Sequence, residues 1–371
     1  MKLLEYNRII LCLTLLAVAS CKKTYYAPHE TTANLDAEVL DVKVDVIPIE
    51  CFGAMGLVAL DSQIVVFTND KESMIKVYDY DGQNIAKLSP SGRAGNEFLD
   101  VQYAWRNKTI NGDRFLYLLD PSDGTYYQYN LSESIRRMAN VRPIKLQTRT
   151  RFVNDVLFRD DGAYFQYQGV SYDDPRDMIF FPPEFKLIDS NGKEKEYLIY
   201  PNLVDFKENK AFSTIFYQHT VRMSLDCKKV VIVSHYEDRI TFIDLDTDSI
   251  FGLRCKDFVD IQQYADASIE TIAKKCIMGV RQVCVVENGI LLLYDKRSVY
   301  DAEVLEKPLD TTIRVYSWEG LYLAEINPSV ILSDFSIDVE NGYLIGLDED
   351  EHFYIANIAN ILNSLFHGKE R

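Results

Sequence analysis

The chain has 371 residues, a formal net charge of −16, 47% hydrophobic residues and 12% aromatic residues. This composition supplies a sizeable apolar core and excludes a largely disordered protein. A surface this acidic repels phosphate backbones and anionic lipid headgroups, so it excludes nucleic acid as a partner and excludes charge-driven adsorption of the folded domain to a membrane.

The first residues have the layout of a bacterial secretory signal with a lipobox. Lys2 and Arg8 precede a short apolar stretch that ends in the motif Val18-Ala19-Ser20-Cys21. The stretch is too short to span a bilayer comfortably, and small residues precede the cysteine as they do at a cleavage site. We therefore expect residues 1–20 to be a signal peptide and Cys21 to be the lipid-carrying first residue of the mature protein. Several acyl chains on that cysteine would hold the protein firmly to a membrane.

After the cysteine, the sequence predicts a flexible tether, then a strand that begins the folded domain. Residues 21–37 are polar, contain Pro28 and show no periodicity, which predicts a flexible tether. Within Val39–Ile49, three valines alternate with charged residues, which predicts a half-buried strand. Residues 38–371 are predicted to form one folded domain, because no long linker divides them.

Six loosely similar units then follow, each with an apolar strand, a turn, an alternating second strand and a tight turn. The clearest unit consists of Ile64–Phe67, Met74–Asp79, the hairpin turn Asp81-Gly82 and Asn84–Leu88. The strand pairs of the other five units are Phe115–Asp120 with Thr125–Tyr129, Tyr164–Tyr167 with Phe185–Asp189, Val230–Ser234 with Arg239–Asp244, Ile290–Asp295 with Thr312–Tyr316, and Tyr343–Asp348 with His352–Ala356.

The spacing of these units predicts the fold class. Repeats of roughly 50 residues are typical of propellers and solenoids, and a strand-rich unit favours the propeller. We therefore expect an all-β, six-bladed β-propeller with minor helical insertions, in which the strand Val39–Ile49 pairs with the last blade to close the ring. Helix-like apolar spacing in Asp260–Lys275 and in a C-terminal stripe predicts two helices that pack against the ring. The stripe consists of Ile358, Ile361, Leu362 and Leu365.

The segment Ser91–Phe98, directly after the first unit, carries a family resemblance. Gly92, Arg93, Glu97 and Phe98 match the Gly-basic-Gly-Pro-Gly-Glu-aromatic linker of NHL-type repeats, while Ala94-Gly95-Asn96 replaces the central Gly-Pro-Gly. With its lipobox and repeating unit, the chain resembles the TolB-like six-bladed propeller lipoproteins common in Bacteroidetes. The resemblance implies a six-bladed propeller and brings no established reaction.

The same loop supplies most of the candidate ligand-binding residues. In a structural interpretation, Gly92 and Gly95 let the backbone turn sharply, and Arg93 forms an ion pair with Glu97 that fixes the loop. In a functional interpretation, the loop contacts a ligand. The candidates for ligand binding are Arg93, Asn96, Glu97 and the aromatic residue Trp105.

No local motif predicts catalysis or a cofactor. The five histidines lack metal-ligand spacing, and the chain contains no nucleophile elbow, Walker loop or dinucleotide fingerprint. Asp244–Asp248 opens like a calcium loop, but Ser249 and Cys255 stand where glycine and glutamate are required, which predicts an acidic turn instead. Asp348–Glu351 is a second acidic turn that could hold a cation weakly. We predict no catalytic, cofactor-binding or metal-ligating residues, and leave calcium as an open alternative.

The cysteines outside the signal and the lipobox are Cys51, Cys227, Cys255, Cys276 and Cys284. Their odd number and irregular spacing favour buried free thiols over a disulfide framework, although one or two bridges are compatible with an exported protein.

Together these features predict a lipid-anchored binding or interaction module with a protein or glycan partner. Lys22 and Lys23 follow the anchor cysteine without an acidic cluster. By resemblance to the sorting signals of enterobacterial and Bacteroidetes lipoproteins, this implies an outer-membrane lipoprotein that faces the periplasm. The alternative is a hydrolase or lyase that uses carboxylates, with or without calcium, in the central channel.

Overall fold

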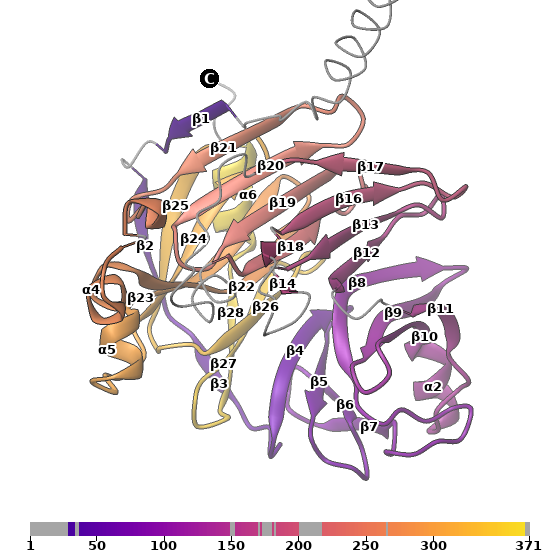
Figure 1. The fold of residues 1–371 in the computed structure, drawn as a ribbon. Coiled ribbons are helices and arrows are strands. Elements are labelled where there is room, and N and C mark those ends of the chain that lie inside the picture. The colour runs from indigo at the N-terminus through magenta and orange to yellow at the C-terminus, as the bar shows by residue number, and fades with distance from the viewer. Residues whose placement is uncertain are drawn as a thin grey trace, which may run out of the picture.

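In a computed structural model, six antiparallel sheets follow one another around a common axis (Figure 1). The structure describes residues 29–33, 37–148, 153–169, 171–172, 180–181, 183–199, 217–264 and 266–367. The predicted signal peptide and Cys21 lie outside the described residues. The sheets are the blades of a six-bladed β-propeller, so the fold class predicted from the sequence is confirmed.

Each blade has four core strands, which are named in order from the axis outward. Blade 1 contains β4 (Ala54–Leu60), β5 (Gln63–Thr68), β6 (Ile75–Asp79) and β7 (Asn84–Leu88). Blade 2 contains β8 (Gln102–Ile110), β9 (Asp113–Asp120), β10 (Thr125–Asn130) and β11 (Ile144–Thr148). Blade 3 contains β12 (Val153–Phe158), β13 (Tyr164–Gln168), β16 (Glu184–Ile188) and β17 (Glu194–Tyr197).

The second half of the chain builds the other three blades. Blade 4 contains β18 (His219–Met223), β19 (Lys229–Ser234), β20 (Arg239–Asp244) and β21 (Ile250–Arg254). Blade 5 contains β22 (Ile277–Val286), β23 (Gly289–Ser298), β24 (Thr311–Ser317) and β25 (Tyr322–Pro328). Blade 6 contains β26 (Asp334–Asp338), β27 (Tyr343–Leu347), β28 (Phe353–Asn357) and β3 (Asp45–Ile47). The strand pairs predicted from the repeat are the second and third strands of the blades.

The N-terminal segment lies along the outer edges of three consecutive blades. β3 pairs antiparallel with β28 and completes the last blade, as predicted, whereas β2 (Glu38–Val42) pairs in parallel with β25 of blade 5. The single strand predicted over Val39–Ile49 is therefore two strands on neighbouring blades. The prediction of a flexible tether over residues 21–37 is wrong for β1 (His29–Thr32), because these residues pair in parallel with β21 of blade 4. Each added strand covers a sheet edge that would otherwise expose unpaired backbone groups.

The hydrophobic core is divided among the interfaces between neighbouring blades. A buried apolar cluster lies between each pair of successive blades. The interface between blades 6 and 1 joins Leu57 and Ile64 to Ile345 and Phe353, so the ring is closed. Inter-blade burial of this kind is the main favourable term in the stability of the fold.

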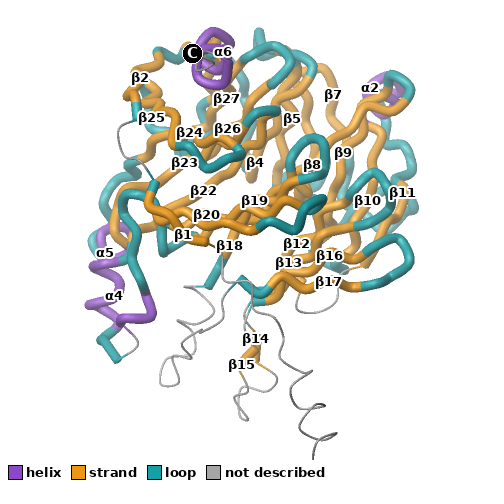
Figure 2. Tube along the Cα trace, turned by 90° about the horizontal axis from the view of Figure 1, so that it is seen from above, coloured by secondary structure: helices purple, strands orange, loops and turns teal. Residues whose placement is uncertain are grey.

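Short helices occupy the margins of the ring (Figure 2). In the region predicted as one helix over Asp260–Lys275, a 3₁₀ turn, η1 (Ile261–Tyr264), precedes α4 (Ile269–Lys275), because the Ser268 side chain accepts from Thr271 N and starts a new helix. Three residues of the predicted C-terminal stripe lie on α6 (Ala359–His367), Ile358 directly precedes it, and all four pack on the core of blades 5 and 6. Three short elements were not predicted: α2 (Leu131–Arg137), α5 (Val299–Glu303) and the hairpin of β14 (Ser171–Tyr172) with β15 (Phe180–Phe181). Across the described residues, no helix has the length and apolar character needed to cross a membrane.

The closing strand offers a direct test of ring closure. Ile47 is 2% exposed in the core between blades 6 and 1, whereas its neighbour Val46 on β3 is 66% exposed. We expect Ile47→Ala to lower the free energy of unfolding by about 2–5 kcal/mol, because it leaves a cavity at the closing interface. Val46→Ala should change it by less than about 0.5 kcal/mol. Equal effects of the two changes in urea unfolding would contradict a stabilising role for the closing strand.

Candidate functional site

The axial channel holds a pocket of about 390 Å³ at the end where the innermost strands finish. This volume lies within the range of small-molecule sites. All six blades contribute to its wall, mainly through the innermost strand of each. The innermost strands of blades 1 to 6 each contribute a wall residue, and examples in blade order are Leu60, Trp105, Phe158, Arg222, Val285 and Ile337.

An irregularity in β8 shapes one side of this pocket. Tyr103 pairs with Leu118 of β9 and Asn107 pairs with Leu116, so two extra residues lie on the β8 side of the pairing. Within this bulge, Trp105 adopts a φ of 54°, a conformation that bulky residues rarely adopt. Bulges and strained residues of this kind redirect side chains and cluster at functional sites.

Trp105 packs against a buried arginine on the inner strand of blade 4. The guanidinium carbon of Arg222 lies 4.0 Å from the centre of the Trp105 ring, a cation–π contact. Arg222 is 6% exposed and donates hydrogen bonds to neutral acceptors, namely Val221 O (2.9 Å), Gln282 Oε1 (3.3 Å) and Val283 O (3.3 Å). Burial lowers the pKa of Arg222 to about 10, so the side chain remains charged at neutral pH.

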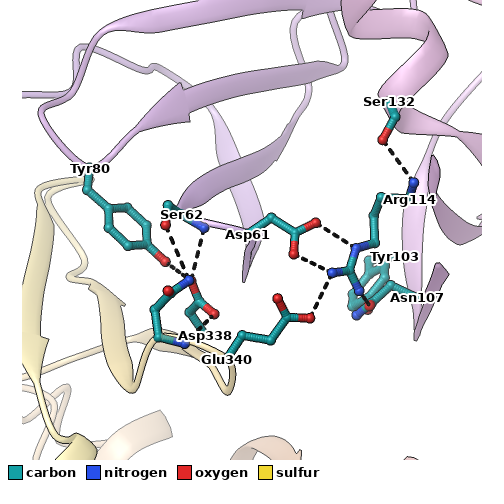
Figure 3. A network of polar contacts seen from close by, with 10 residues as sticks. Asp61, Ser62, Tyr80, Tyr103, Asn107, Arg114, Ser132, Asp338 and Glu340 are labelled. Carbon is teal, nitrogen blue, oxygen red and sulfur yellow. Dashed lines mark hydrogen bonds and ion pairs between the residues drawn. The ribbon is translucent and has the colours of Figure 1, made fainter. Parts of the chain in front are cut away.

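A second arginine bridges three blades at the edge of the pocket (Figure 3). Arg114 at the start of β9 donates from Nε to Asp61 Oδ2 (2.8 Å) and from Nη2 to Glu340 Oε1 (3.0 Å). Its Nη1 donates to Asn107 Oδ1 (2.9 Å), and Asn107 in turn donates to Tyr103 Oη (3.1 Å). Asp61 lies in the β4–β5 turn and Glu340 in the β26–β27 turn, so Arg114 joins blade 2 to blades 1 and 6.

The third carboxylate of the pocket, Asp338, is held by hydrogen bonds. Its Oδ2 accepts from the Tyr80 hydroxyl, from Ser62 N (3.1 Å) and from Asn341 Nδ2 (2.8 Å) (Figure 3). Burial alone would raise the pKa of Asp338, but these hydrogen bonds outweigh it and lower the pKa below its ordinary value. A carboxyl group with a lowered pKa remains ionised at neutral pH and is a poor general acid.

Two further basic residues line the pocket and reach toward blade 3. Arg106 Nη2 and Lys108 Nζ both form ion pairs with Asp160, the latter at 2.8 Å. The Arg106 guanidinium also lies over the Tyr117 ring, 5.1 Å from its centre. Arg106 Nη1 is buried and has no hydrogen-bond acceptor within the part of the chain that the structure describes.

The sequence-predicted ligand residues separate into two places. Trp105 lines the pocket, whereas Arg93, Asn96 and Glu97 lie in the surface loop between blades 1 and 2, away from the pocket wall. The predicted Arg93–Glu97 ion pair is wrong for the described residues, because Glu97 Oε2 instead accepts from Ala94 N (2.9 Å). A Cβ at position 92 would approach that oxygen to 1.8 Å, so Gly92 provides room for the carboxylate.

The cysteines and the two acidic turns occupy structural positions in the described part of the chain. The five cysteines of the propeller are free and buried, as predicted, and burial raises the pKa of the pocket thiol Cys284 well above its ordinary value. Both predicted acidic turns are hairpin turns, of β20–β21 and β27–β28. In the latter, Asp348, Asp350 and His352 bring one ligand atom each within 4.8 Å of one another. Asp348 Oδ1 already accepts from the backbone of Asp350 and His352, as in an ordinary Asx turn.

Comparison with known proteins assigns the fold to a family. Residues 57–340 match the family model described as TolB-like 6-blade propeller-like, which is more than half of the chain. The chain belongs to the TolB-like six-bladed propeller family. No curated protein matches this TolB-like propeller.

Two solved structures from Bacteroides resemble this TolB-like propeller. One is a protein of Bacteroides fragilis described as exported, with 11% identity and a TM-score of 0.51 over 89% of this chain and 98% of that chain. Another is a member of the DUF4221 family from Bacteroides vulgatus, with 11% identity and a TM-score of 0.51 over 85% of this chain and 97% of that chain. At this identity, the similarity shows the fold alone.

Hydrogen bonds through the side-chain amide of Gln282 link Arg222 to the carboxyl group of Asp334. Gln282 Oε1 accepts from Arg222, while Gln282 Nε2 donates to Asp334 Oδ1 (2.8 Å) on β26. Burial raises the pKa of Asp334 to about 6, because it outweighs the hydrogen bonds from Gln282 and from backbone N–H groups. Asp334 therefore binds its proton more tightly in this TolB-like propeller than in the unfolded chain.

This shift predicts a pH dependence with a defined sign. The stabilising contribution of protonated Asp334 is complete below the unfolded pKa of about 3.9 and is lost as the pH rises through about 6. We expect the stability advantage of the natural protein over Asp334→Asn to shrink or reverse between pH 4.5 and pH 7.5 in urea unfolding. Asp45→Asn, at an exposed position on β3, is the control for removal of one carboxylate. A constant difference between Asp334→Asn and the natural protein would contradict the assignment.

Proposed function

We propose that the protein is an exported, lipid-anchored binding protein whose axial pocket holds a small organic ligand. The observation that carries this proposal is the pocket of about 390 Å³, walled by residues of every blade and shaped by the strained bulge at Trp105. Such a site combines apolar walls with a few fixed polar groups, which is the usual construction of a ligand pocket.

The interactions of the pocket carboxylates support a binding function over the alternative of a hydrolase or lyase. Asp61 and Glu340 are paired with Arg114, and hydrogen bonds keep Asp338 ionised. The lowered pKa of Asp338 is the opposite of what a carboxylic acid needs to donate a proton near neutral pH. These groups are better suited to holding the pocket in shape and accepting hydrogen bonds from a ligand.

The two tryptophans allow a direct test of ligand binding. Trp318 lies away from the pocket, packed against Phe242, so Trp318→Phe leaves Trp105 as a fluorescent reporter within the pocket wall. We expect at least one compound from a panel of neutral and charged sugars, amino acids and small organic acids to change Trp105 emission in a saturable way. Such a change would report occupancy of the pocket, because Trp105 lines it.

A pair of valine variants supplies the control for that titration. Val339 lies on the pocket wall, whereas Val39 is exposed on β2 outside it. Val339→Phe should narrow the pocket and weaken binding at least five-fold, while Val39→Phe should leave binding unchanged. Absence of any saturable change across the whole panel, or equal effects of the two valine variants, would contradict a ligand-binding role for the pocket.

The location of the protein is the second part of the proposal. The lipobox ending at Cys21 supports lipid attachment, and one structural relative is itself described as an exported protein. Lys22 and Lys23 support an outer-membrane position facing the periplasm.

Mutation of the proposed anchor tests this location. We expect the natural protein to sediment with membranes and Cys21→Ala to move to the soluble fraction, because the folded domain is too acidic to adsorb by charge. Cys51→Ala, at a buried thiol of the propeller, is the matched control and should stay with the membrane. A Cys21→Ala protein that still sediments with membranes would contradict the anchor, and protease sensitivity on intact cells would contradict the periplasmic orientation.

A further inference from the structure

Four basic side chains line the pocket of a strongly acidic protein, and one of them differs from the others. Arg114 is paired with two carboxylates, and Arg106 and Lys108 share Asp160. Within the described residues, no carboxylate forms an ion pair with Arg222. Arg222 is 6% exposed and its hydrogen-bond acceptors are neutral, while the carboxylates of Asp155 and Asp334 attract it from beyond ion-pair distance. A buried charge without a direct ionic partner is costly to keep in a folded protein.

The geometry of Arg222 leaves hydrogen-bond donors available to an incoming anion. A guanidinium group carries five N–H donors, two of them on each terminal nitrogen. Nη1 and Nη2 of Arg222 each make one hydrogen bond, so each has a second N–H group to offer. The Trp105 ring covers a face of the guanidinium plane, so an acceptor must approach at the edge, where a carboxylate binds best. Arg106 Nη1 is a further buried donor on the same pocket wall.

The opposite side of the pocket limits the charge of the ligand. Asp61, Asp338 and Glu340, from blades 1 and 6, bring three negative charges to the pocket wall, of which Arg114 compensates one. A phosphate or sulfate group, with its larger charge, would be repelled more strongly by these carboxylates than a single carboxylate would. Phe158 and Ile337 add apolar surface for an uncharged body. The pocket therefore favours a small molecule with one negative charge.

We propose that Arg222, held in place by Trp105, is the anion-binding residue of the axial pocket and that the ligand is a small organic monocarboxylate. This inference rests on the proposed function, because it names the ligand class of the same pocket. The negative group binds at the guanidinium edge, and the uncharged part of the ligand extends toward the acidic side, where hydroxyl groups can donate to the exposed carboxylate of Glu340.

Matched pairs of carboxylates and their neutral counterparts test this inference on the natural protein by titration calorimetry. The probes are benzoate with benzamide, cyclohexanecarboxylate with its amide, and glucuronate with glucose, and sulfate and phosphate are added as competitors. We expect at least one carboxylate to bind ten-fold or more tightly than its neutral partner. Sulfate and phosphate should displace it only weakly.

Variants assign the effect to Arg222. Arg222→Met should weaken carboxylate binding at least ten-fold without changing the affinity for the neutral partner, and Arg222→Lys should retain part of the preference. Arg137→Met removes the same charge from an exposed position on α2 and should leave binding unchanged. Thermal unfolding of each variant shows whether it folds. The comparison of matched probes on the natural protein remains decisive even if Arg222→Met does not fold.

The outcomes separate this inference from the proposed function. Equal affinity for carboxylates and their neutral partners, or full carboxylate affinity in a folded Arg222→Met protein, would overturn the anion-binding role while the pocket remains a binding site. Tighter binding of sulfate or phosphate than of any carboxylate would overturn the monocarboxylate class. If neither these probes nor the wider fluorescence panel bind, the proposed function itself fails.

Discussion

Closure of the ring is the constraint on which the site depends. β3, from the start of the chain, completes blade 6, and the buried cluster around Leu57 and Phe353 joins that blade to blade 1. Only in a closed ring do turns that are far apart in sequence meet at one end of the channel. The contact of Arg114 with both Asp61 and Glu340 is possible for this reason, since the three residues come from the second, first and last blades.

The bulge in β8 converts this scaffold into a pocket with a specific chemistry. A regular strand would place its side chains by simple alternation, whereas two extra residues bring both Trp105 and Arg106 to the pocket wall. A strained backbone conformation costs about 1–3 kcal/mol. A desolvated cation–π contact contributes about 2 kcal/mol, so the stacking of Trp105 on Arg222 offsets strain of this size. The same contact fixes the plane of the guanidinium group.

The sequence predicted the second and third strands of every blade, because their apolar alternation and Asp/Gly turns are local signals. It missed the innermost strands, whose exposure to the channel admits polar residues and, in β8, a bulge that hides the alternation. Trp105 was selected as an aromatic residue, but Arg222 and Arg114 are single basic residues without a motif. Their only local signal is a basic residue beside apolar neighbours, as Arg222 stands between Val221 and Met223. Their meeting depends on long-range closure, which no local pattern encodes.

The order of the N-terminal strands has a mechanical consequence. β1, β2 and β3 attach to blades 4, 5 and 6 in series, and the strand that closes the ring comes last. Tension applied from the N-terminal side must detach β1 and then β2 before any load reaches β3. The pairings of β1 and β2 must therefore break before a force on the N-terminal side disturbs the closing strand. The protein can lengthen under force while its pocket keeps its shape.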